Sequence, residues 1–171
     1  MPRNDLGYHF QRTEQLIEEM AKFVPNSLGA AAEFRADLAG LLVVMIVASY
    51  ENCVKGILVN YAMRQHIAFG EFAENNYEKL NSRINISDLH KYAELFGEKI
   101  SKRFKAVLLS KTQRIDKRLG KNIGTCYEQL LRWRHSFAHS GVRSTTIEEA
   151  ASTHRFAKRV LFAFHQAFDE A

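Results

Sequence analysis

Residues 38–59 read LAGLLVVMIVASYENCVKGILV, and this segment sets the fold class. On a helix its apolar residues point in all directions around the axis, which predicts a central helix packed on most sides. The helical pattern extends without interruption from about Leu28 to His66. No segment alternates apolar and polar residues between hairpin turns, so no strand is expected. The sequence therefore predicts an all-α domain.

Helical periodicity continues on both sides of this central helix. The first helix must stop before Pro25, because the residue that precedes a proline is pushed out of the α region. We expect further helices over residues 69–83, over 88–96 with Ser87 as its cap, over 98–119, over 122–139, and after a capping box of Thr146 and Glu149.

These segments predict an elongated up-and-down bundle of five or six helices. We expect one domain over residues 1–171, in which residues 1–27 are an N-terminal helix and turn and residues 28–171 are the core.

The amino-acid composition and the cysteine positions argue against several classes of protein. The 171 residues include 46% hydrophobic and 25% charged residues, with 2 Pro and 9 Gly, which is typical of a globular domain. Cys53 and Cys126 form no Cys-x-x-C pair, which argues against a zinc module, a redox site and a secreted disulfide scaffold. The longest apolar run, Leu38–Ala48, is shorter than the roughly 20 residues of a membrane helix. We expect a cytoplasmic protein with no membrane span, metal or cofactor.

Positive charge is concentrated in residues 99–121. This segment has nine Lys and Arg residues against Asp116 alone, a local charge of +8 in a chain whose net charge is +5. Such a concentration indicates a surface for a polyanion, although a solvated basic helix has the same composition. The RNA-binding residues predicted here are Lys102, Lys105, Arg114, Lys117, Arg118 and Lys121.

Arg134 is the one charged residue on the apolar side of the helix over 122–139. With Ile123 at 0°, Arg134 falls at about 20°, inside the apolar arc. An unpaired guanidinium is costly to bury, so Arg134 must meet a carboxylate, a ligand phosphate or a partner subunit. The alternative to a functional role is an internal ion pair, for which Glu51 is the candidate.

His139 lies at the end of the same helix, beside Ser140 and Gly141. It is about 140° around the axis and about 7.5 Å along it from Arg134, so one intact helix does not bring both side chains to one phosphate. Either the last turn unwinds, or two copies of the helix meet across a two-fold axis. The chemistry that such a cleft supports is RNA cleavage, with histidine as the base and arginine neutralising phosphate charge.

Residues 130–141, LLRWRHSFAHSG, resemble the Arg-x4-His signature of the HEPN (higher eukaryotes and prokaryotes nucleotide-binding) superfamily. Residues 51–55, ENCVK, resemble the Glu-x3-Lys/Arg element of several HEPN clades. The chain has the long helix with residues 51–55 first, then the helix with residues 130–141, and then a closing helix. This layout is most similar to the RiboL-PSP-HEPN group, over roughly residues 30–168.

This resemblance implies a metal-independent endoribonuclease that cleaves single-stranded RNA as a homodimer, with Arg134 and His139 as catalytic residues. His135 stands where the family often has Asn or Asp. The supporting residues are His135, Glu51, Lys55 and Ser140. Such domains recur in toxin–antitoxin and defence systems, so an antitoxin or other regulatory protein is an expected partner.

Three alternatives stay open. Glu51 and Lys55 have the spacing of an ordinary i,i+4 salt bridge. Some HEPN domains are catalytically silent, and the chain would then be a helical module that binds RNA or a protein. His135 and His139 have the spacing of two metal ligands on one helical face, which suits a metal-dependent hydrolase, but the sequence offers no evident third ligand.

Overall fold

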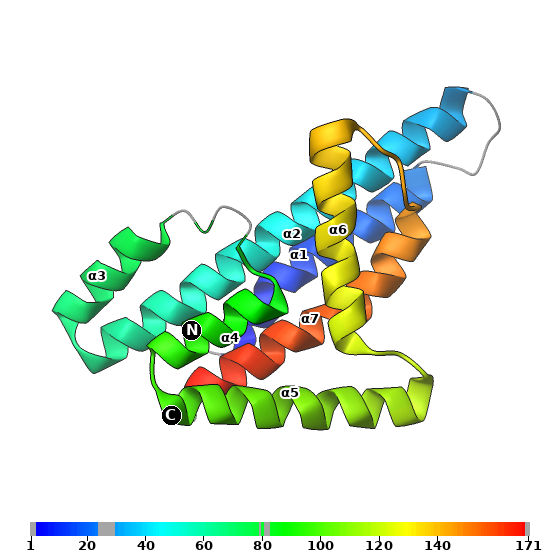
Figure 1. Cartoon of the computed structure of the whole chain (residues 1–171). Coiled ribbons are helices and arrows are strands. Elements are labelled where there is room, and N and C mark those ends of the chain that lie inside the picture. The colour runs from blue at the N-terminus through cyan, green and yellow to red at the C-terminus, as the bar shows by residue number, and fades with distance from the viewer. Residues whose placement is uncertain (1–2, 24–29, 79, 81–82, 170–171) are drawn as a thin grey trace.

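The computed structural model describes residues 3–23, 30–78, 80 and 83–169. Within these ranges the chain forms seven α-helices and no strand (Figure 1). The all-α prediction is confirmed, with seven helices instead of five or six. The helices are α1 (Arg3–Phe23), α2 (Ala30–Gln65), α3 (Ile67–Tyr77), α4 (Ile86–Leu95), α5 (Glu98–Leu119), α6 (Ile123–Ser140) and α7 (Ile147–Asp169).

Helix α2 is the centre of the fold, as its apolar pattern predicts. It packs against α1, α3, α6 and α7, and Leu42 and Ile46 are fully buried. One strip stays open to solvent, with Phe34, Leu41 and Met45 exposed by 59%, 50% and 47%. By length and composition alone α2 could span a membrane, but half of its most apolar 18-residue segment is buried inside the fold. The core helix of a globular protein has the same length and composition.

Helix α7 is the second organising element, because it contacts α1, α2, α5 and α6. In Figure 1, α1, α2 and α7 run along one diagonal, α6 crosses in front of α2 and α7, and α5 forms the lower edge. The N-terminal end of α6 follows α5 through a short connection, and its C-terminal end reaches the first half of α2. The two ends of α6 therefore lie in different parts of the molecule.

A buried aromatic cluster joins α2, α6 and α7. The rings of Tyr50 and Tyr127 stack with centroids 5.4 Å apart, and the Tyr127 hydroxyl donates to the Ile84 carbonyl oxygen at 2.7 Å. The Tyr50 hydroxyl shares a hydrogen bond of 2.9 Å with Nδ1 of His154. Burial, followed by the charge of Lys158, lowers the pKa of His154 to about 4. His154 is therefore a neutral core residue at neutral pH.

Several predicted helix ends are confirmed by their caps. The helix over 98–119 ends at Gly120, whose φ of 61° lies in the left-handed region. Asn122 caps the following helix, and its side chain accepts a hydrogen bond from the Thr125 amide at 3.0 Å. Thr146 caps α7 by accepting from the Glu149 amide at 3.1 Å. These are local signals, and the surrounding fold leaves them unchanged.

The cap of α4 and the bounds of α3 differ from the prediction. Asn85, and not Ser87, caps α4, because its side chain accepts from the Asp88 amide at 2.8 Å while Ser87 donates to Asn85. The helix expected over 69–83 begins earlier and ends at Tyr77. The end of the central helix agrees with the prediction of about His66, since α2 ends at Gln65, and Nδ1 of His66 accepts from the Ala68 amide at 3.2 Å and so caps α3.

Candidate active site at the end of helix α6

Helix α6 carries the Arg-x4-His segment and stays helical through Ser140. Its last turn closes on Gly141, which has a φ of 63° and donates its amide to the Phe137 carbonyl oxygen at 2.9 Å. Glycine adopts this left-handed conformation without the steric cost of a Cβ atom. His139 thus lies within an intact turn, and the unwound arrangement is not the one that the structure adopts.

Phe137 fixes the end of α6 against α2. A Cβ atom built at Gly40 would lie 2.2 Å from two carbons of the Phe137 ring. Only a residue without a side chain lets the ring approach the α2 backbone this closely. The contact places the final turn of α6, with the candidate catalytic residues, against the first half of α2.

Two ion pairs tie the turn after α6 to the same part of α2. The Arg143 guanidinium donates to both carboxylate oxygens of Asp37, at 2.6 and 2.8 Å. Arg35 pairs with Glu148 at the start of α7. The turn that follows His139 is therefore held on α2 by charge as well as by the Phe137 ring.

Arg134 is partly buried and forms no hydrogen bond or ion pair with any residue that the structure describes. The internal alternative, a pair with Glu51, is therefore not formed. Three kinds of partner were expected for Arg134. No carboxylate in the described part of the chain pairs with it, which leaves a ligand phosphate or a second subunit. A partly desolvated guanidinium without a partner favours binding of an anion.

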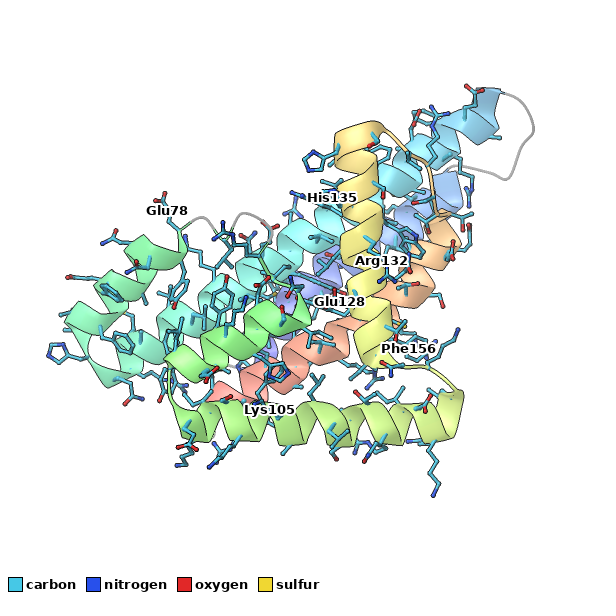
Figure 2. All side chains as sticks on the ribbon, in the orientation of Figure 1. Glu78, Lys105, Glu128, Arg132, His135 and Phe156 are labelled. Carbon is cyan, nitrogen blue, oxygen red and sulfur yellow. The ribbon has the colours of Figure 1, made fainter. Side chains whose placement is uncertain are left out.

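His135 and His139 lie together on the exposed surface of α6. Their ring centroids are 4.5 Å apart and their planes meet at 50°, and both side chains are exposed. Figure 2 shows His135 on the side of α6 turned away from the core, along with Arg132. Because Arg134 and His139 are about 140° apart on an intact helix, a single chain does not bring these two side chains together.

A family model for RiboL-PSP-HEPN matches residues 9–170. The chain belongs to the RiboL-PSP-HEPN family. Neither the comparison with curated proteins nor that with solved structures gives a match. Membership of this HEPN family points to a role in RNA cleavage or RNA binding.

Glu51 and Lys55 of this RiboL-PSP-HEPN domain are both partly buried on α2. The ordinary i,i+4 salt bridge between them is not formed. Glu51 lies close enough to Tyr127 to add to the rise of that hydroxyl's pKa, which burial causes in the first place. Tyr127 precedes Arg134 by two helical turns, so Glu51 faces the first half of α6.

The remaining supporting residue, Ser140, ends α6 and is exposed. The histidine pair next to it has no further ligand nearby: within the described ranges, no group of three His, Cys, Asp or Glu side chains could hold a metal ion.

The predicted RNA-binding residues of the HEPN domain are all exposed, but they do not form one stripe. Lys105, labelled on α5 in Figure 2, is nine residues before Arg114, which puts the two on opposite sides of the helix, about 180° apart. Lys102 pairs with Glu98 at 2.7 Å. Helix α5 is followed by the N-terminal end of α6, whereas His139 lies near the other end of α6, about 24 Å away along the α6 axis.

Sequence reasoning missed Asp37 and Arg143, which hold the turn after His139. Their positions are 106 residues apart, and each is an ordinary surface charge in its local sequence. Gly40 offered a signal, because a glycine within a long helix often marks a close approach of another element.

Proposed function

We propose that this domain is a metal-independent endoribonuclease that cleaves single-stranded RNA in a cleft shared by two copies. Arg134 carries the proposal, because it is a partly buried arginine without a partner in the described chain and it belongs to the Arg-x4-His segment of a HEPN domain. An RNA phosphate is the anion that would pair with it.

The proposed chemistry uses the two residue types in different roles. His139 takes the proton of a 2′-OH, and the oxygen attacks the adjacent phosphorus. Arg134 neutralises the charge that builds on the phosphate oxygens. The 5′-oxygen leaves with a proton from solvent water, and the products are a 2′,3′-cyclic phosphate and a 5′-OH end. His135, whose ring lies 4.5 Å from that of His139, would hold the substrate beside it.

A surface for the second copy lies on α2. The exposed side chains Phe34, Leu41 and Met45 are spaced by seven and four residues, which places them within an arc of about 40°. Leu41 follows Gly40, the residue that contacts Phe137 of α6. A second copy that covers this apolar strip would lie beside the end of α6 and could bring its own Arg134 and His139 to the same cleft.

Cleavage of a mixed-sequence RNA in excess EDTA tests the proposal. We expect the purified wild-type protein to produce 2′,3′-cyclic phosphate ends, and we expect Arg134→Ala and His139→Ala to abolish them. His9→Ala is a matched control, because His9 is an exposed histidine on α1 away from α6. Retained cleavage in either α6 variant would refute the assignment of the site, and loss of cleavage in EDTA would refute metal independence.

A second candidate is a catalytically silent module that binds RNA or a protein. It is favoured by the separation of Arg134 and His139 within one chain. This candidate predicts no cleavage under any condition, and binding that the His139→Ala variant keeps.

A further inference from the structure

A cavity of about 240 Å³ lies between α5 and α7, away from the end of α6. It is lined by Lys111, Arg114 and Ile115 of α5 and by Lys158, Arg159 and Phe162 of α7. Four of these six side chains are cations and none is acidic. Two helices that are separated in the chain by α6 thus place their positive charges around one hollow.

The four cations of this α5–α7 pocket differ in whether they interact with other residues of the fold. Lys158 pairs with Glu14 of α1, and Lys111 also has an interaction within the fold. Arg114 and Arg159 are exposed, and neither forms a hydrogen bond or ion pair with a residue in the described ranges. Two guanidinium groups at the mouth of the pocket are therefore available to an anion, and their planar forks suit phosphate oxygens.

The rest of the lining is apolar. Ile115 is buried and Phe162 is partly buried. Binding sites for single-stranded nucleic acid combine cations along the backbone with apolar and aromatic surfaces against the bases. The pocket offers both on the scale of one nucleotide, which the exposed lysines on the other side of α5 do not.

We propose that the α5–α7 pocket binds a backbone phosphate of single-stranded RNA and anchors the strand at a distance from Arg134 and His139. The choice of RNA as ligand rests on the proposed function. Because α5 leads into the N-terminal end of α6, and His139 is about 24 Å further along that helix, the anchored phosphate lies several nucleotides from the bond to be cut.

The test is binding of a fluorescein-labelled 12-nucleotide RNA, measured by anisotropy over a range of salt concentrations in the His139→Ala background, so that the RNA stays intact. Adding Arg114→Gln and Arg159→Gln should weaken binding by about tenfold or more at low salt. The slope of log affinity against log salt should fall by about 1.4, since each lost contact with a single strand contributes about 0.7.

Two further variants of equal charge show whether the pocket itself is responsible. Lys22→Gln with Lys91→Gln removes two exposed lysines of α1 and α4, and we expect affinity within about twofold of the parent. Lys102→Gln with Lys105→Gln removes two charges from the opposite side of α5, and we expect a smaller loss than in the pocket variant. An equal loss in these variants, an unchanged pocket variant, or a parent that binds no RNA would each overturn the inference.

Cleavage assays distinguish a failure of this inference from a failure of the proposed function. If the pocket variant binds RNA poorly while the domain with an intact His139 cleaves nothing, the inference stands and the endoribonuclease proposal fails. If RNA is cleaved but the Arg114→Gln/Arg159→Gln variant binds as well as the parent, the endoribonuclease proposal stands and the pocket inference fails.

Discussion

The Phe137 ring occupies the space that a side chain at Gly40 would fill, with two ring carbons 2.2 Å from the position of a Cβ atom there. Phe137 lies between Arg134 and His139 in the chain, so this contact sets the position of both candidate catalytic residues relative to α2. A missing side chain in the central helix thus determines where the end of α6 sits.

Gly40→Ala should destabilise the fold and displace the end of α6, because the flat ring has no flexible tip that can move aside. Overpacking of this kind costs about 1–3 kcal/mol, measurable by urea unfolding. Gly7→Ala is the matched control, because Gly7 is an exposed helical glycine with no atom within 4 Å of a Cβ atom built there. The Gly7→Ala substitution should raise the free energy of unfolding by about 0.5–1 kcal/mol. Equal effects of the two substitutions would contradict the role of Gly40.

Arg134→Met should leave the stability unchanged or raise it. Arg134 has no partner in the described chain, so methionine removes a partly desolvated charge and keeps much of the side-chain volume. We expect the free energy of unfolding to stay within about 0.5 kcal/mol of wild type or to increase, while RNA cleavage is lost. A clear loss of stability would show that Arg134 has a structural role.

Mixing two inactive variants should restore cleavage if the cleft is shared. In a mixed dimer, the Arg134→Ala subunit supplies His139 and the His139→Ala subunit supplies Arg134. The proteins are unfolded and refolded together, and cleavage is compared with each variant treated alone. Persistent inactivity of a mixture in which mixed dimers are detected would argue against a site built from one residue of each copy.

Stability should fall as the pH drops from about 6.5 to 4. The pKa of His154 is lowered from 6.5 to about 4 in the folded protein, so between these values the unfolded chain binds the additional proton. Stability from this group is complete above pH 6.5 and is lost toward pH 4, by about 3 kcal/mol in total. Urea unfolding at a series of pH values measures the loss.

The double substitution Tyr50→Phe/His154→Phe should make that pH dependence shallower. It replaces both partners of the 2.9 Å hydrogen bond, so no buried polar group is left without a partner. A pH profile parallel to that of wild type would show that other groups cause the loss.

Local signals predicted the helices that have their own end markers. Gly120, Asn122 and Thr146 lie at the ends of α5, α6 and α7 as expected. The end of the central helix near His66 was also expected, but the start of α3 at Ile67 was not, because only the imidazole that caps α3 marks it. Ser87 and Asn85 are both good capping residues, and the sequence does not show which of the two side-chain oxygens accepts from an amide of the first turn.

The roles of the candidate site residues stay a prediction, and the structure bears only on how these residues are arranged. The family match covers the Arg-x4-His segment, and helical geometry alone places Arg134 and His139 on different sides of α6. The internal pair of Arg134 with Glu51 could be judged only from the packing of α6 on α2. The α5–α7 pocket could not be foreseen either, because Arg114 and Arg159 become neighbours only when two distant helices pack together.

The ion pairs Arg35–Glu148 and Arg143–Asp37 close chain segments of 113 and 106 residues. During synthesis the N-terminal part of a chain emerges and folds first, so α2 has neither of these partners until residues 143 and 148 have been made. A nascent or prematurely terminated chain that stops before Arg143 therefore lacks the contacts that hold the turn after His139. In the proposed ribonuclease, this order of assembly would delay activity until both α6 and the start of α7 have been made.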